Sequence, residues 1–266
     1  MEYKTRAYGK VNIGLKVGEK RADGYHNIDS YFLLIPFFDE LEFSLAEGPY
    51  SVAIEGNEKY LASGKMDIME KAAFLYHKRS GVDFSLRIKV SKHIPQEAGL
   101  GGGSTDASAV LSFLNSCFHA FSSSDLLYLS KEVGADVPFF LSGEKCAKVG
   151  GIGEKITPME WTLPYKYISL FRAPGSGVST KEAYEELDKR KTKQYSLPPL
   201  TFPLTREAFP NDFEILEGKE MLKTISPFLS PSDYASLSGS GSVWFLLSKE
   251  RKNPGVKEFL GCREIL

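Results

Sequence analysis

The sequence predicts a globular α+β protein, and three observations support this prediction. The chain has 266 residues, of which 42% are apolar, and this is enough for a packed core and far from the composition of disordered chains. Leu41, Phe43 and Leu45 alternate with polar neighbours, which is the period of a half-buried strand. Other segments have the spacing of amphipathic helices. A chain of this length forms one large domain or two smaller ones.

In the first part of the chain, the first 56 residues are predicted to form mostly strands. A helix is predicted over 67–79, with Gly81 just past its end, and a strictly alternating strand over 84–90. The next helix is predicted to start at Ser104 or Thr105. A short helix over 125–133 is predicted to start at Ser123 or Ser124 and to stop before 134.

The glycine cluster at 150–153 is the predicted boundary between domains 1–153 and 154–266. Beyond it, strands are predicted over 167–171 and 242–248, and helices over 180–189, 213–225 and 256–260, the first of them capped by Ser179. This order suits an α+β domain with helices on one face of a sheet. Residues 189–209 combine a charge run with three prolines and are predicted to be a solvated surface connection.

Composition excludes several classes of protein. The net charge of −1 argues against a nucleic-acid binder, and the densest apolar run, over 31–38, is far shorter than the ~20 residues of a membrane helix. The start of the sequence lacks the apolar segment of a secretory signal. Three widely spaced cysteines suit a reducing cytoplasm, and the histidines and cysteines lack metal-ligand spacing, so neither a disulfide scaffold nor a metal site is expected.

The most informative feature is a glycine-rich loop, Gly-Leu-Gly-Gly-Gly-Ser-Thr-Asp over 99–106, placed between a predicted strand and a predicted helix. Glycines let the backbone approach an anion closely, and the N–H groups at the start of the helix bind negative charge. The loop lacks the lysine of a Walker motif, and the chain has neither G-x-G-x-x-G nor G-x-S-x-G. A phosphate cradle of another fold is therefore predicted.

Three motifs in order resemble those of the GHMP kinases. Pro95 with residues 99–107 resembles their second motif, Lys10-x-Asn12-x-x-Leu15 their first, and residues 237–242 their third. The resemblance covers essentially the whole chain. It implies a two-domain α+β fold, with an N-terminal domain like the second domain of ribosomal protein S5 and a ferredoxin-like C-terminal domain. It also implies ATP as co-substrate and Mg²⁺ across its phosphates.

Within that family, residues 21–26, 134–140 and 209–214 resemble one branch in particular. Its substrate is 4-diphosphocytidyl-2-C-methyl-D-erythritol, a precursor in the non-mevalonate route to isoprenoids. The resemblance implies phosphorylation of the 2-hydroxyl of this small molecule. It implies no nucleic-acid or membrane partner.

The resemblance also assigns site residues. Lys10 and Asp136 correspond to the family's catalytic pair, in which a carboxylate accepts the proton of the attacking hydroxyl and a cation orients it. Residues expected to bind ATP are Lys92, Pro95, Gly99, Leu100, Gly101, Gly102, Gly103, Ser104 and Thr105.

Tyr25 and His26 correspond to the pair that holds the cytosine ring, and Tyr184 falls where the family has an aromatic on the other face of the ring. Tyr184 is the weaker assignment, because a tyrosine four residues into a helix more often packs in the core. Asn12 and residues 238–241 are expected to line the diphosphate-sugar region or to support the ATP loop.

Two positions depart from the family pattern. Glu97 adds a negative charge beside the loop and is expected to face solvent, because an inward orientation would weaken ATP binding. Asp67 replaces an asparagine near the adenine site and puts that contact in question.

Two other readings stay open at this point. A kinase for another small alcohol, such as homoserine or mevalonate, would need no group that stacks on a base, whereas residues 23–26 supply one. A ligand sensor or an RNA-binding relative with the same fold would not need both Lys10 and Asp136, and the charge balance disfavours RNA.

Overall fold

The computed structural model describes residues 1–56, 66–173, 180–189 and 196–266. These fall into two compact units. The first unit takes residues 1–9, 37–96 and 101–143, and the second takes residues 10–36, 97–100 and 144–266. Each unit is thus assembled from separate stretches of the chain. The division of the sequence into domains 1–153 and 154–266 stays a prediction.

The predicted strands of the first 56 residues are confirmed as β1 (Glu2–Lys20), β2 (His26–Ala46) and β3 (Ser51–Gly56). They join β4 (Ser85–Ser91), β5 (Cys146–Gly150) and β6 (Lys155–Pro158) in a sheet of order β3-β4-β2-β5-β6, with β1 paired to β2. Strand β3 runs parallel to β4, whereas β2 runs antiparallel to β4 and β5. The glycines at 150–153 form the turn between β5 and β6.

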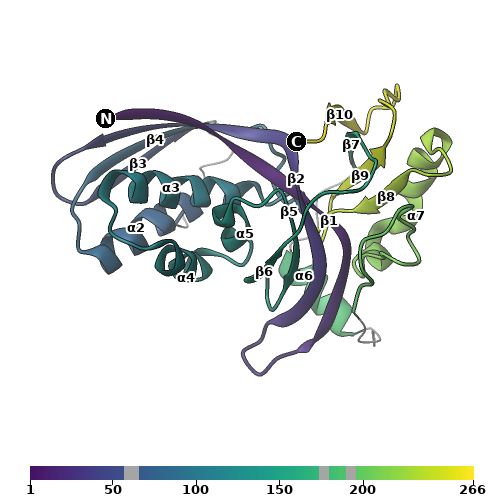
Figure 1. Cartoon of the computed structure of the whole chain (residues 1–266), viewed down its shortest axis with the longest axis horizontal. Helices are drawn as coiled ribbons and strands as arrows, with labels where there is room; N and C mark the ends of the chain where they lie inside the picture. Colours follow the sequence, from purple (N-terminus) through teal and green to yellow (C-terminus); the bar gives the residue numbers. More distant parts are fainter. Residues whose placement is uncertain (57–65, 174–179, 190–195) are drawn as a thin grey trace. The chain divides into compact units, whose positions relative to one another are not determined.

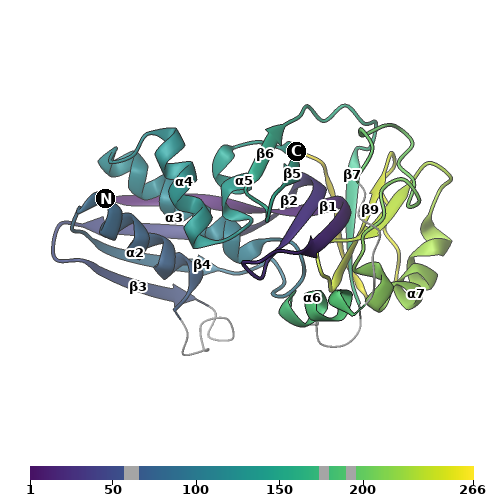
Figure 2. The ribbon, with the colours of Figure 1, turned by 90° about the horizontal axis from the view of Figure 1, so that it is seen from below.

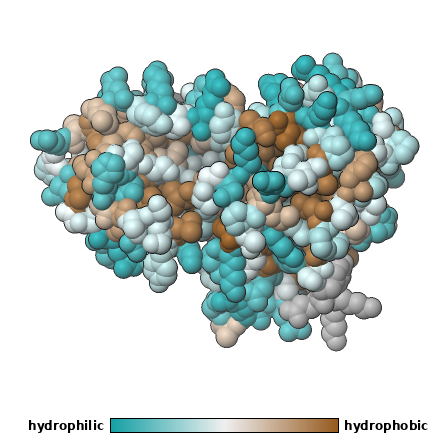
Figure 3. All heavy atoms as spheres, in the orientation of Figure 1, coloured by the Kyte–Doolittle hydropathy of each residue, from teal (hydrophilic) through white to brown (hydrophobic). Residues whose placement is uncertain are grey.

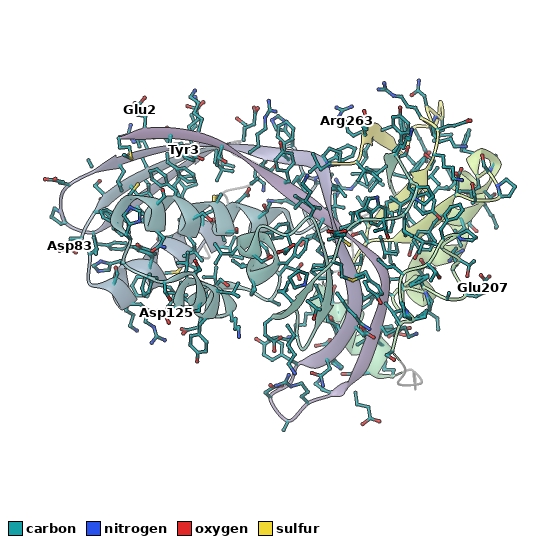
Figure 4. All side chains as sticks on the ribbon, in the orientation of Figure 1. Glu2, Tyr3, Asp83, Asp125, Glu207 and Arg263 are labelled. Atoms are coloured by element: carbon teal, nitrogen blue, oxygen red, sulfur yellow. The ribbon has the colours of Figure 1, made fainter. Side chains whose placement is uncertain are left out.

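In the first unit, four helices pack on one face of the sheet (Figure 1). They are α2 (Ile68–Ser80), α3 (Gly102–Phe118), α4 (Ser123–Val133) and α5 (Val137–Ser142). Phe113 of α3 lies under the sheet, with its ring centroid 4.6 Å from Phe43 and 5.6 Å from Tyr3, which is labelled in Figure 4. Aromatic stacking of this kind joins the helix layer to both β1 and β2.

The helix ends show which local signals decide the boundaries. Asp67 caps α2 by accepting from the backbone N–H of Met69 at 2.7 Å, and α2 ends at Gly81, as expected. Helix α4 is capped by Ser122, one residue before the serines expected. The expected start of α3 at Ser104 or Thr105 is wrong. Gly101 adopts φ +70°, so the chain turns there and α3 begins at 102.

The second unit contains a four-stranded antiparallel sheet of order β10-β7-β9-β8. Its strands are β7 (Tyr167–Arg172), β8 (Tyr234–Leu237), β9 (Val243–Ser248) and β10 (Phe259–Glu264). Helices α6 (Thr180–Asp188) and α7 (Glu214–Ile225), the latter followed by a 3₁₀ turn over Ser226–Phe228, cover one face of this sheet (Figure 2). This core contains Phe171, Ala183, Leu187, Met221, Ile225, Trp244 and Leu246.

One expectation for this unit is wrong. Residues 256–260 form no helix, because the chain there leads into β10, which pairs with β7, and tertiary pairing overrides a weak local pattern. The described part of 189–209 contains no helix or strand and is mostly exposed, as expected of a surface connection, although Leu197, Leu204 and Phe209 are buried. The Leu204 N–H donates to the Tyr165 hydroxyl at 3.0 Å. The expected cap at Ser179 lies outside the described residues.

Among the described helices, none combines the length and the hydropathy needed to cross a membrane. On the face shown in Figure 3, hydrophobic side chains form separate patches among hydrophilic ones.

Candidate active site

A row of polar side chains lies along β1 in the second unit. Lys10 and Asn12 are two residues apart and share one face of the strand. Lys10, Asn12 and Lys16 are only 3%, 1% and 6% exposed. The Lys10 ammonium donates to Asn12 Oδ1 at 2.7 Å and lies 4.6 Å from the ring centroid of Phe32. Lys16 pairs with Asp212. The predicted catalytic lysine is thus a buried, hydrogen-bonded cation.

The first half of the glycine loop, residues 97–100, belongs to the same unit and packs against the third motif. Ser238 Oγ donates to the carbonyl of Gly99 at 2.9 Å, and the N–H of Lys10 donates to the carbonyl of Leu100 at 2.9 Å. A Cβ on Gly99 would lie 1.8 Å from the carbonyl oxygen of Ser238. No side chain fits there, so glycine is required at position 99.

The third motif therefore supports the loop. A Cβ on Gly239 would lie 3.0 Å from the Cα of Gly99 and 3.6 Å from Asn12 Oδ1. The amide of Asn211 fixes this turn by donating to the carbonyls of Leu237 at 2.8 Å and Gly239 at 2.9 Å. Of the two roles expected for residues 238–241, the structure shows support of the loop.

The second half of the loop lies in the first unit and begins α3. Gly101 is the N-cap, Gly103 is exposed, and Thr105 is buried behind them. A Cβ on Gly102 would lie 3.0 Å from the Ile94 side chain. The 17-residue helix therefore starts on three consecutive glycines, at 101, 102 and 103. This is the arrangement that binds phosphate in other proteins.

A buried charge cluster lies beneath this helix start. Lys92 pairs with both Asp39 and Asp106, and the Asp39 carboxylate also accepts from the backbone N–H groups of His93 at 2.5 Å and Ile94 at 2.8 Å. Burial raises the pKa of Asp106 to about 7, although Lys92 opposes the shift. The two carboxylates hold the pKa of Lys92 above its ordinary value, despite burial that lowers it. Asp39 was not predicted, and Asp106 was visible only as the end of the glycine run.

The other expected ATP ligands differ in burial. Lys92 has its ammonium on the two carboxylates, and its reach to a nucleotide stays a prediction. Pro95 is half-buried in the segment after β4, and the side chain of Leu100 is buried in the core. Ser104 is half-buried in the first turn of α3.

Asp136 stands at the start of α5, half-buried, and its side chain makes no capping bond to that helix. A capping role, the ordinary alternative for an aspartate at this position, is therefore absent. Its pairing with Lys10 stays a prediction.

The expected base site lies around the turn between β1 and β2. Tyr25 is 58% exposed at this turn, whereas His26 is 7% exposed. His26 Nε2 lies 2.7 Å from Asp188 Oδ1, and its ring stacks on Tyr184 with centroids 5.0 Å apart. The hydrogen bond to His26 holds the pKa of Asp188 below its ordinary value. One face of Tyr184 is thus covered by His26, and a base clamp by Tyr25 and Tyr184 stays a prediction.

Both departures from the family pattern have structural explanations. Glu97 is exposed, as expected, with φ +51°, and its carbonyl accepts from the N–H of Ser242 at 3.1 Å. Asp67 serves as the N-cap of α2. Within the described ranges, no group of three or more His, Cys, Asp or Glu residues is placed to hold a metal ion.

Comparisons with known proteins identify related sequences and structures. Residues 67–144 match the model of the GHMP kinases N terminal domain. The 4-diphosphocytidyl-2-C-methyl-D-erythritol kinase of Prosthecochloris aestuarii is 36% identical over 91% of this chain and 87% of its own length. The enzyme of the same name from Thermosipho africanus is 36% identical over 92% of this chain and 90% of its own.

A solved structure of a 4-(cytidine 5'-diphospho)-2C-methyl-D-erythritol kinase superposes with a TM-score of 0.73 at 32% identity, covering 92% of this chain and 90% of that one. Homoserine kinase from Cytophaga hutchinsonii, with a TM-score of 0.62 at 15% identity over 93% of this chain and 85% of that one, shares the fold. The expected two-domain GHMP kinase fold is confirmed. This chain belongs to the 4-diphosphocytidyl-2-C-methyl-D-erythritol kinase family of GHMP kinases.

Proposed function

We propose that this protein transfers the γ-phosphoryl group of ATP to the 2-hydroxyl of 4-diphosphocytidyl-2-C-methyl-D-erythritol. The observation that carries the proposal is identity above 30% to kinases of that name over nine-tenths of the chain. The glycine loop and the buried Lys10 add the chemistry that such a transfer needs.

The proposed reaction is an in-line displacement. The substrate hydroxyl oxygen forms a bond to the γ-phosphorus while the bond from that phosphorus to the β–γ bridging oxygen breaks, and ADP leaves. Asp136 accepts the hydroxyl proton. Lys10 offsets negative charge on the transferred group, and its contact with Asn12 holds the ammonium in place.

ATP is proposed to bind with its phosphates at the start of α3. Gly101, Gly102 and Gly103 have no side chains that would keep a phosphate away from the backbone N–H groups. The positive end of the helix dipole favours the phosphate charge. Mg²⁺ would supply positive charge that offsets the charge of the phosphates. The hydroxyls of Ser104 and Thr105 are hard oxygen donors of the kind that Mg²⁺ prefers, so the donor set fits this ion.

The cytidine end of the substrate is proposed to bind at Tyr25, His26 and Tyr184, where the exposed ring of Tyr25 is available to a flat base and the buried His26 stacks on the half-buried Tyr184. Asn12 lies on the β1 face that carries Lys10 and is proposed to contact the diphosphate-sugar portion. A cytoplasmic location is also proposed, because Cys117, Cys146 and Cys262 are all unpaired.

A substrate panel tests the proposal. ATP consumption is measured with 4-diphosphocytidyl-2-C-methyl-D-erythritol, mevalonate and homoserine at equal concentrations. We expect turnover with the cytidyl substrate alone. Turnover with mevalonate or homoserine and none with the cytidyl substrate would instead support the other small-alcohol kinases that share the fold.

A further inference from the structure

Ser30 lies on β2 beside the Asn12 amide, and its side chain is 0% exposed. We propose that Ser30 is a positioning residue of the kinase, because its hydroxyl fixes the Asn12 amide in the orientation that holds the Lys10 ammonium. The inference deepens the proposed function and rests on it, since Lys10 is taken to act in phosphoryl transfer. Nothing in the residue pattern singles out Ser30.

The hydrogen bonds have a defined direction. The Ser30 hydroxyl has one hydrogen, and it donates this to the carbonyl of Gly14 at 2.6 Å. Its oxygen is therefore left as an acceptor, and Asn12 Nδ2 donates to it at 3.1 Å. The other end of the Asn12 amide, Oδ1, then faces Lys10 and accepts from its ammonium at 2.7 Å.

A flipped Asn12 amide is disfavoured at both ends. Its NH₂ group would face the Lys10 ammonium, so two donors would meet. Its oxygen would face Ser30 Oγ, whose hydrogen is already used, so two acceptors would meet. Asn12, Ser30 and Lys10 are all at most 3% exposed, and water therefore does not compensate for mispaired groups.

The Asn12 oxygen gives the Lys10 ammonium an acceptor in a fixed direction. The four-carbon side chain of Lys10 is flexible, and the attraction to the Phe32 ring, whose centroid is 4.6 Å away, acts on the charge without selecting one N–H direction. Without the Ser30 hydroxyl, either amide orientation becomes possible, and the hydrogen bond from the ammonium to Asn12 is lost for part of the time.

The backbone of β1 makes the arrangement possible. Gly14 adopts φ +66°, a conformation that favours glycine, and it supplies the carbonyl that takes the Ser30 hydrogen. A Cβ at this position would lie 2.9 Å from the side chain of Leu197. Gly14 therefore belongs to the same hydrogen-bond network as Asn12 and Ser30.

The first test compares Ser30→Ala with a matched control, Ser248→Ala. Ser248 is also a strand serine of the second unit, 0% exposed, and its hydroxyl donates to a backbone carbonyl, that of Glu250, at 2.7 Å. Ser30→Ala is expected to lower kcat by about 10- to 100-fold, as loss of an orienting partner does, with the KM for ATP unchanged. Ser248→Ala should keep the parent kcat. Parental kcat in folded Ser30→Ala would overturn the proposal.

A double-mutant cycle shows whether Ser30 acts through Asn12. Adding Ser30→Ala to Asn12→Ala is expected to change kcat by less than about twofold, because the positioned group is already gone. Multiplicative losses in the double variant would show that Ser30 acts independently of Asn12, which contradicts the proposal.

The Asn12 side-chain amide provides a readout that does not depend on activity. In the parent protein its two protons are expected to exchange slowly in ¹⁵N-resolved NMR spectra, and the Asn12→Ala spectrum identifies the signals. Fast exchange in the parent would contradict the network even if Ser30→Ala failed to fold. Slow exchange in a parent that does not phosphorylate the cytidyl substrate would refute the proposed function and leave the network standing.

Discussion

Residues 97–100 and 101–106 are consecutive, yet the two halves of the glycine loop are held by different forces. The first half is fixed by hydrogen bonds to its carbonyls, which Glu97, Ala98 and Gly99 accept from residues 238–243 at 2.9–3.4 Å. The second half starts α3 and lies over the buried charges of Lys92, Asp39 and Asp106.

The difference shows that glycine has two purposes in one motif. At 99 the backbone of Ser238 occupies the place of a side chain, so glycine is a packing requirement. At 102 the nearest atoms to an added Cβ belong to the buried Ile94 side chain, at 3.0 Å. The proposed purpose of glycine there is to let a phosphate approach the helix N–H groups. The first half therefore carries rigidity, and the second half is proposed to carry binding.

The largest effect is expected from a substitution outside both halves of the loop, at Asp136. It should change the rate of phosphoryl transfer without changing ATP binding. Asp136→Asn removes the proposed general base and should lower kcat by about 10²- to 10⁴-fold while the KM for ATP stays close to the parent value. Steady-state kinetics on the folded variant measure both. Lys10→Met should not multiply this loss, because the two groups act as one unit. A kcat within a few-fold of the parent would make Asp136 structural.

Gly99→Ala should have the next largest effect. Its methyl group would lie 1.8 Å from a backbone oxygen, so the chain must shift by more than 1 Å, and displacements of this size cost about 100-fold in activity. Urea unfolding should show lower stability as well. Gly255→Ala is the control, because an added Cβ there meets nothing within 4 Å. A fully active Gly99→Ala enzyme would show that the packing of the first half is unimportant.

Gly102→Val should act on nucleotide binding. The branched side chain would press against the buried Ile94, 3.0 Å from an added Cβ, and so displace the first turn of α3. Loss of a hydrogen bond from this turn to a charged phosphate should raise the KM for ATP by about 10- to 100-fold. Circular dichroism checks that α3 remains folded. An unchanged KM for ATP in the folded variant would show that the phosphates of ATP do not bind at this half of the loop.

Asp106→Asn should have the smallest effect, on the pH dependence of stability. Burial raises the pKa of Asp106 from 3.8 to about 7, so the folded protein holds a proton that the unfolded chain releases. Its contribution to stability is present below pH 3.8 and is lost as pH rises to about 7. Asp106→Asn should flatten the free energy of unfolding across this range. Denaturant titrations at several pH values measure this free energy. An unaltered pH profile would contradict the raised pKa of Asp106.

Local patterns predicted much of this molecule. Alternation identified β2 and β4, and helical spacing with Gly81 at the end identified α2, because these signals lie within the element itself. Strand β10 was missed because only its pairing with β7 stabilises it.

The site was predictable only where a motif is continuous in sequence. Asp39 lies 53 residues from Lys92, and Ser30 lies 18 residues from Asn12. Neither has a neighbour in sequence that hints at its role. Their partners are set by the pairing of strands, which an isolated residue does not reveal.

Competition by nucleotides tests the central claim, phosphorylation of a cytidyl substrate, most directly. Initial rates are measured with varied cytidyl substrate and varied ATP in the presence of CDP or UDP. CDP should compete with the cytidyl substrate and not with ATP. UDP should bind about 5- to 150-fold more weakly, because mispaired buried polar groups cost about 1–3 kcal/mol. Equal inhibition by CDP and UDP would contradict the claim.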